Sequence, residues 1–383
     1  MMPLDRAMFA DKLNRYMSQF NVPVEDLSRQ TGIDLERAKA LLDLSAEPTG
    51  DEVLILADYF KCDFKFFISN EKLAPFEQTE ALFRMHGSDL APEDRWAIQE
   101  FLFLCECQEY LLSMQQDARR QSFLFKKTGK FYKQHGTDAA AALRRHLGYA
   151  PHEIPGNVFD AFRRIRVHVF RRKLGRSAIS GLFVRHPSAG ACVLVNYSED
   201  VFRQRFTAAH ETGHAILDDG KDFVVSFGAV GTKDLSEVRA NTFASRFLLP
   251  PEFLMSIPAA SAWTDAEFLD HAARLLVNAE TLAYALSDAR LVSGSRAKAL
   301  AGLKVPQSRK ADPELPASLS PRSLLRKQEL LQRGLSDSYV SLCFDAYERD
   351  SISAGRLAEI LLVSEAELAE IAGLYGRALS HGD

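Results

Sequence analysis

Apolar residues recur at helical spacing along most of the chain. On a helix they fall at i, i+3, i+4 and i+7, whereas on a half-buried strand they alternate. Gly32, the segment 48–50 and the pair Pro250 and Pro251 interrupt this pattern, as glycine and proline do at helix ends. The spacing predicts helices over residues 5–20, 24–31, 34–43, 50–60, 63–69, 92–117, 201–217 and 235–248.

Two short runs rich in β-formers stand apart from the helical pattern. Residues 180–184 and 191–195 flank a turn-like segment, 187–190, which predicts a β-hairpin. The fold class that we expect is therefore mostly α with a small β-sheet. We also hypothesise that the strand 191–195 lies at a sheet edge, where an extended peptide substrate can add as a further strand.

Breaks in the pattern divide the chain into five predicted parts. A proline-rich stretch, 291–322, is interpreted as a linker. After it, a small helical unit is predicted, with Ser353 and Ser364 as N-caps. The parts are an N-terminal helical domain at 1–70, a helical connector at 71–135, a domain with the predicted hairpin at 136–290, the linker at 291–322 and the C-terminal unit at 323–383.

The composition is that of a folded, water-soluble protein. The chain has 383 residues, 46% of them hydrophobic and 26% charged, which excludes wholesale disorder and fibrous repeats. It has no run of eighteen apolar residues and no apolar core in its first residues, so we expect neither a membrane span nor secretion. Five scattered cysteines fit reduced thiols. We expect a cytoplasmic protein.

Charge is distributed unevenly. Residues 1–70 carry eight basic and twelve acidic side chains, whereas residues 119–176 carry fifteen basic and three acidic ones. The basic stretch also contains aromatic residues, so it is a candidate for binding single-stranded nucleic acid, the alternative being a solvated basic face. The candidate nucleic-acid-binding residues are Arg163, Arg164, Arg166, Arg171, Arg172 and Lys173.

The strongest chemical signal is the pentapeptide 210–214, His-Glu-Thr-Gly-His. On a helix, His210 and His214 lie one turn apart on the same face, so both imidazoles can bind one metal ion. Glu211 is turned about a hundred degrees away and faces the water that such an ion activates. This arrangement predicts a metal-dependent hydrolase in which Glu211 is the general base.

A third ligand is expected on the next helix. Glu237 begins a face that continues through Asn241 and Ala244, and the small residues allow close approach of two helices. Two histidines and a glutamate leave a position open for water, as in catalytic zinc sites. Asn241 and Asp218 are candidates for orienting the imidazoles.

At these residues the chain resembles the ImmA/IrrE family of metallopeptidases. The resemblance rests on 195–214, which includes the pentapeptide, and on 237–250, which includes Glu237 and Asn241. It implies a gluzincin-like domain with His210, His214 and Glu237 as ligands of Zn²⁺, or alternatively Mn²⁺. The chain departs from the family pattern at Thr212 and Arg239, and neither residue is expected to touch a ligand or the base.

The resemblance also implies a function: cleavage of a partner repressor of helix-turn-helix type, which derepresses stress, mobile-element or phage-defence genes. Two alternatives are a DNA-binding transcription regulator with a sensory peptidase-like domain, and an antitoxin-like module in which proteolysis is vestigial. DNA, single- or double-stranded, is a second candidate partner, as ligand or signal. The intact set of ligands and base favours the enzyme.

Three further expectations concern the surroundings of this site. Tyr197, just before the helix of the pentapeptide, is a candidate catalytic residue that donates to the oxyanion, or else a packed aromatic. Residues 8–69 resemble an XRE-type helix-turn-helix, which binds either DNA or another protein; its net negative charge favours protein. The C-terminal unit resembles the helical tail of longer family members and is expected to serve docking or packing.

Overall fold

The computed structural model describes residues 4–62, 64–68, 90–115, 122–175, 178–227, 234–257, 260–316 and 318–379. The chain divides into two compact units. Unit 1 comprises residues 1–103 together with 174–178. Unit 2 comprises residues 104–173 and 179–383.

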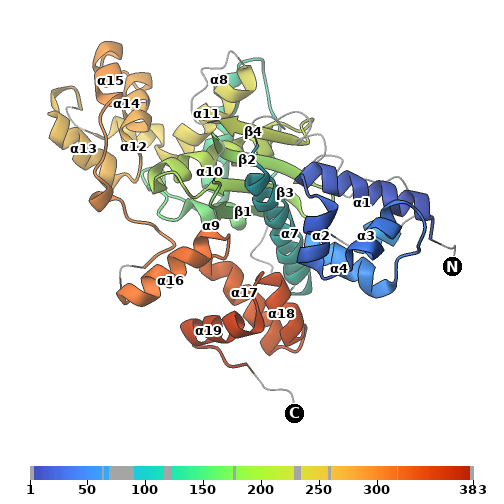
Figure 1. Cartoon of the computed structure of the whole chain (residues 1–383). Coiled ribbons are helices and arrows are strands. Elements are labelled where there is room, and N and C mark those ends of the chain that lie inside the picture. Colours follow the sequence, from blue (N-terminus) through green and yellow to red (C-terminus); the bar gives the residue numbers. More distant parts are fainter. Residues whose placement is uncertain are drawn as a thin grey trace. The chain divides into compact units, whose positions relative to one another are not determined.

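Unit 1 is a helical bundle (blue in Figure 1). Its core contains many aromatic side chains; Phe20 and Trp96, for example, have ring centroids 4.3 Å apart. Gly32 ends the second helix in the left-handed conformation, and Asp34 caps the third by accepting from two backbone amides. Its helices are α1 (Arg6–Phe20), α2 (Val24–Thr31), α3 (Leu35–Leu42), α4 (Gly50–Phe60) and α5 (Phe64–Ile68), with the first part of α7 (Pro92–Gln115).

Unit 2 contains a four-stranded mixed sheet, counted over the described residues, in the order β1-β3-β2-β4. β2 and β3 form the predicted hairpin, and Gly190, with φ of +76°, makes its tight turn. β1 pairs with β3 in parallel, and β4 pairs with β2 antiparallel. The strands are β1 (Val167–Arg172), β2 (Ile179–His186), β3 (Gly190–Asn196) and β4 (Phe223–Phe227).

This strand order overturns one expectation. Residues 191–195 lie in β3, which is paired on both sides, by β1 and by β2. All the ladder positions of β3 are therefore used, and no substrate strand can add there. The edge hypothesis is wrong because β1, a strand that the basic composition of its region concealed, pairs with β3. Among the described strands, the edges belong to β1 and β4.

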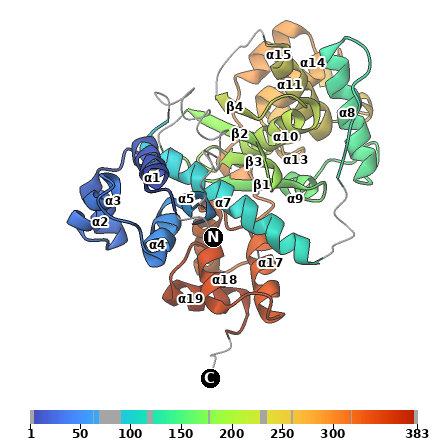
Figure 2. The ribbon, with the colours of Figure 1, turned by 90° about the vertical axis from the view of Figure 1, so that its right-hand side faces the viewer.

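Helices surround the sheet. α10 packs on β2 and β3, α9 on β1, and α11 packs between α8 and α10. Figure 2 shows α10 and α11 beside the sheet. The core between these elements includes Phe183, Val193 and Phe247, all fully buried. These helices are α8 (Tyr132–His146), α9 (Val158–Arg163), α10 (Val201–Leu217) and α11 (Leu235–Leu248).

Helices also complete unit 2 toward the C-terminus (yellow to red in Figure 1). Ser353 and Ser364 cap α18 and α19 as predicted. The helices are α12 (Pro251–Met255), α13 (Asp265–Arg274), α14 (Ala279–Asp288), α15 (Gly294–Ala301), α16 (Pro321–Gln332), α17 (Asp337–Glu348), α18 (Ala354–Ile360) and α19 (Glu365–Tyr375).

The segment expected to be a linker, 291–322, contains more structure than its prolines suggested. It contains α15, and the side chain of Glu314 is only 5% exposed because it pairs with buried arginines. A composition rich in proline does not reveal such long-range ion pairs. The division into five parts stays a prediction, and residues 71–89 and 116–121 of the expected connector lie outside the described residues.

The expected fold class, mostly α with a small β-sheet, is confirmed. The eight predicted helices begin and end within two residues of observed ones, apart from positions 63, 69, 116 and 117, which lie outside the described residues. β1, β4 and most helices after residue 248 were not predicted. None of the described helices is both long and apolar enough to cross a bilayer.

Candidate metal centre

Helix α10 brings the two histidines of the pentapeptide together. It begins after Asp200, whose side chain accepts hydrogen bonds from the amides of Phe202 and Arg203. His210 and His214 lie one turn apart inside the molecule and are 6% and 0% exposed. Their Nε2 atoms are 3.1 Å apart, so both rings face the same point.

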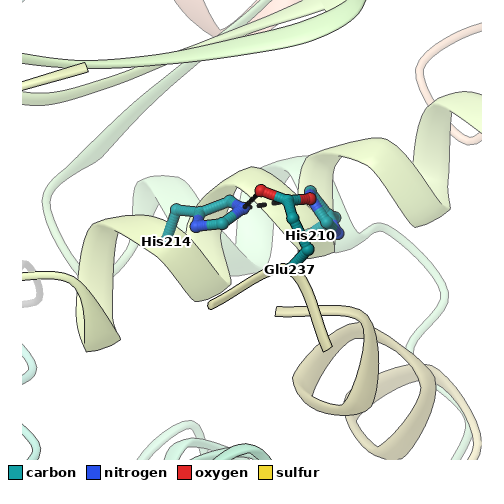
Figure 3. Close-up of side chains that lie close together, drawn as sticks. All are labelled: His210, His214 and Glu237. Carbon is teal, nitrogen blue, oxygen red and sulfur yellow. Dashed lines mark hydrogen bonds and ion pairs between the residues drawn. The ribbon is translucent and has the colours of Figure 1, made fainter. Parts of the chain in front are cut away.

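Glu237 reaches the same point from α11. Asp234 caps this helix and Glu237 lies in its first turn. The carboxylate contacts both rings, with Oε2 3.2 Å from His210 Nε2 and Oε1 3.2 Å from His214 Nε2. Figure 3 shows the three side chains converging from the two helices. One ligand atom from each lies within 4.8 Å of the others, an arrangement that could hold a metal ion.

Small residues allow α10 and α11 to approach closely. A Cβ atom built on Gly213 would lie 3.4 Å from Ala240 Cα and 3.0 Å from a ring carbon of Phe243. A larger side chain at 213 would therefore push the helices apart. The glycine of the pentapeptide thus helps to bring Glu237 within reach of the histidines.

The outer nitrogen of each imidazole is held by a hydrogen-bond partner. His214 Nδ1 donates to Asp218 Oδ2 at 2.8 Å, and His210 Nδ1 donates to Asn241 Oδ1 at 2.9 Å. With the proton on Nδ1, each Nε2 directs a lone pair toward the other and toward a carboxylate. Asp218 and Asn241 are therefore in the positions expected for residues that orient the imidazoles.

The two Nε2 lone pairs and the Glu237 carboxylate together favour a positive charge between them. Burial acts to lower the pKa of His214, but its hydrogen bonds with Asp218 and Glu237 outweigh it and raise the pKa to about 9. Burial acts to raise the pKa of Glu237, but the two imidazoles lower it well below its usual range. The donor set thus suits a proton or a divalent cation, and two nitrogens with one carboxylate fit the ligands of catalytic zinc.

Glu211 lies against β2, where a Cβ atom built on Gly181 would be 3.0 Å from its Oε1. It is fully buried, and in the described part of the chain no partner lies within hydrogen-bond distance of its carboxylate, although the Ser226 hydroxyl lies near enough to lower its pKa. Burial raises the pKa of Glu211, against the opposing effect of His210 and His214. A buried carboxylate without partners is costly in a fold, and such groups are concentrated at functional sites.

Tyr197 has contacts that bear on its expected role, and that role stays a prediction. Its ring stacks with the guanidinium of Arg171, 5.0 Å away, and its carbonyl accepts from Gln204 in the first turns of α10. His210 lies six residues farther along, about 9 Å at the helical rise. The contact with Arg171 favours the packed-aromatic alternative for Tyr197.

The six candidate nucleic-acid-binding residues do not form one surface, which corrects a second expectation. Arg163 and Arg171 are buried and pair with Glu314, and Arg171 also pairs with Asp312. Their partners follow 141 to 151 residues later, in the segment interpreted as a linker. Arg172 donates to the carbonyl of Arg333, whereas the exposed residues are Arg164, Arg166 and Lys173.

Two residues near the cluster were not identified from sequence as part of a site. Gly181 on β2 lies against Glu211, and Arg239 on α11 donates to Asp218 Oδ1. The sequence offered a signal only for Arg239, its departure from the family pattern. Gly181 has no motif around it, and only the packing of β2 on α10 identifies it.

The comparison with known families agrees with this geometry. Residues 162–287 match the family model of the IrrE N-terminal-like domain, a peptidase family. This match spans β1 to α14 and includes all three members of the cluster and Glu211. These residues are therefore similar to the peptidase family that the motifs indicated. No curated protein matches the chain.

Proposed function

We propose that the protein is a metal-dependent endopeptidase in which His210, His214 and Glu237 hold Zn²⁺, or alternatively Mn²⁺. The observation that carries this proposal is the convergence of two imidazole lone pairs and one carboxylate beside the buried, unpartnered Glu211. A divalent ion bound by these ligands would act as a Lewis acid that activates water and polarises a peptide carbonyl.

The roles of the other residues follow from their contacts. Glu211 accepts the proton of the attacking water and delivers it to the leaving amine, and its raised pKa brings it closer to the range useful near neutral pH. Asp218 and Asn241 keep the protons of the two rings on Nδ1, so that both Nε2 atoms stay available as ligands. Peptide hydrolysis consumes one water and needs no further reactant.

We propose that the substrate is a specific partner protein, a helix-turn-helix transcriptional repressor whose cleavage derepresses stress, mobile-element or phage-defence genes. The family match supports a peptidase, and the repressor is inferred from the resemblance. A regulator without catalytic activity is the alternative. It has no use for a buried carboxylate at position 211, so the enzyme is favoured.

Unit 1 is proposed to contact protein rather than DNA. Both basic side chains of α3 are engaged by acidic ones: Arg37 pairs with Glu52, and Lys39 pairs with Glu36. A helix whose cations are already neutralised gains little from phosphates. The negative charge of residues 1–70 supports the same reading.

The first experiment measures metal content by mass spectrometry in wild type, His214→Ala and Glu237→Ala. The proposal expects about one zinc or manganese per wild-type chain and loss of the ion in both variants. Wild type that stays empty after reconstitution with either metal would contradict it. If Glu237→Ala kept the metal ion while His214→Ala lost it, Glu237 would not be a ligand.

A second experiment searches for the substrate. Cells producing wild type or Glu211→Gln are compared by proteome-wide labelling of new N-termini. We expect Glu211→Gln to keep the metal and to lose a cleavage found with wild type, in a helix-turn-helix protein. Identical N-termini in the two cultures, under all stresses tried, would favour the regulator without catalysis.

A further inference from the structure

Asp218 connects the cluster to a residue with no assigned role. Its Oδ2 accepts from His214 Nδ1 at 2.8 Å, and its Oδ1 accepts from the guanidinium of Arg239. The side chain of Asp218 is 2% exposed, and Asp218 is the C-cap of α10. One buried carboxylate therefore joins the imidazole of α10 to an arginine of α11.

Arg239 is itself held in place. It follows Glu237 by two residues on α11, its side chain is 10% exposed, and the ring of Tyr132 lies 5.2 Å from the guanidinium carbon. A second cation, Lys221, lies 3.7 Å from Asp218, but it is 40% exposed and therefore more strongly screened. Among the described residues, Arg239 is thus the buried cation that neutralises Asp218.

The charges of the site explain why a cation is needed here. Glu211, Asp218 and Glu237 bring three carboxylates around two imidazoles. A divalent ion on neutral histidines would leave one negative charge in excess, and Arg239 balances it. A hydrogen bond between two ionised groups is also stronger and more directional than a neutral one, so it limits rotation of Asp218.

We propose that Arg239 is a positioning residue: it holds the Asp218 carboxylate in the orientation that accepts from His214 Nδ1, which directs His214 Nε2 to the metal. This rests on the proposed function only in that His214 is a metal ligand. Arg239 is neither a proposed ligand nor the proposed base, and its effect passes through Asp218.

A double-mutant cycle tests this route, with zinc affinity measured by competition with a chromophoric chelator. Arg239→Ala is expected to weaken zinc binding 10- to 100-fold, as losses of groups that orient ligands do. In an Asp218→Ala background the same change should cause no further loss. An equal loss in both backgrounds, or none in wild type, would overturn the proposal.

Two controls separate positioning from general damage. Arg246→Ala also removes a partly buried arginine from α11, one paired with Asp288 at 3.5 Å, and should leave zinc affinity unchanged. The visible spectrum of the Co²⁺-substituted protein should shift in Arg239→Ala and stay unchanged in Arg246→Ala. An unshifted spectrum in Arg239→Ala would contradict the proposal.

Should Arg239→Ala fail to fold, Arg239→Lys and Arg239→Met provide the comparison. Arg239→Lys keeps a cationic donor for Asp218, whereas Arg239→Met keeps only the apolar stem. The Arg239→Lys protein should therefore bind zinc at least threefold more tightly than the Arg239→Met protein. Equal affinities would overturn the proposal. Wild type without metal affinity would overturn both this inference and the proposed function, whereas absence of cleavage alone would affect only the latter.

Discussion

Gly181 of β2 lies directly against Glu211 of α10. A Cβ atom built at position 181 would be 3.0 Å from Glu211 Oε1 and 2.4 Å from Thr207 Cγ2. Its absence allows the strand to approach the helix at the turn that carries the proposed base. Packing of β2 on α10 thus requires glycine at this position. The close approach that glycine allows places the Glu211 carboxylate against the strand.

Gly181→Ala is expected to impair catalysis more than metal binding. The added methyl group must displace Thr207 or Glu211, and a small displacement of a general base can lower the rate about a hundredfold. Turnover of the identified substrate and zinc content are the two measurements. Gly220→Ala, where nothing lies within 4 Å of the added carbon, is the control and should change neither. Unchanged turnover in Gly181→Ala would show that the helix adapts without cost.

Glu211→Gln is expected to stabilise the metal-free protein. Because burial raises the pKa of Glu211, the folded state favours the protonated carboxyl and is destabilised by ionisation as the pH rises. Glutamine resembles the protonated form, so the free energy of unfolding should rise by about 1–3 kcal/mol at pH 7.5. Urea unfolding in the presence of a chelator measures it. The gain should shrink on acidification, and a gain independent of pH would contradict the explanation.

The ion pairs of Glu314 should contribute strongly to stability. Glu314 bridges Arg163 and Arg171, and all three side chains are less than 10% exposed. Glu314→Ala leaves buried cations short of a partner and should cost about 3 kcal/mol. Asp270→Ala, which breaks the exposed pair with Arg309, should cost less than about 1 kcal/mol. Chemical unfolding compares the two, and equal losses would argue against a buried network.

His186 should make stability depend on pH. Its Nδ1 accepts from the amides of Ser188 and Ala189, so a proton there would face two donors. Burial, with a smaller effect of His168, lowers the pKa of His186 to about 4, although Glu106 Oε1 lies 3.3 Å from Nε2. The folded protein favours the neutral imidazole, whereas the unfolded chain takes up a proton near pH 6.5. The fold therefore has its full stability above about pH 6.5 and loses part of it as the pH falls from about 6.5 to 4.

The test is His186→Asn, since the asparagine oxygen can replace Nδ1 as acceptor. Wild type should lose about 1 kcal/mol more than the variant between pH 7.5 and 5.5, in unfolding experiments at both values. The exposed His152→Asn is the control and should follow wild type. The explanation would be wrong if His186→Asn lost as much stability on acidification as wild type does.

Local features of the protein were predictable from sequence. The range 201–217 was obtained to the residue from apolar periodicity, which depends only on neighbours along the chain, as does the Asp200 cap that the structure shows. The spacing of His210 and His214 then determined that they share a face. The range of α11 followed in the same way, and with it the position of Glu237 in a first turn.

Contacts between distant segments were not predictable. Arg171 was interpreted as part of a basic surface, yet Asp312, 141 residues later, neutralises it inside the molecule. Tyr197 was a candidate for catalysis or for packing because it precedes α10, and its ring lies against that same arginine. In both cases the side chain's partner comes from another part of the chain, which periodicity does not encode.

The sequence by itself therefore determined the mostly α character, the helix of the pentapeptide, and the residue types of the cluster of two histidines and one glutamate. The tertiary structure decided which strand lies in the middle of the sheet, how close Gly181 brings β2 to Glu211, and that Arg239 reaches His214 through Asp218. The physical reason is the range of the interactions. Helical hydrogen bonds and caps act within a few residues, whereas packing and buried ion pairs depend on which surfaces meet when the chain has folded.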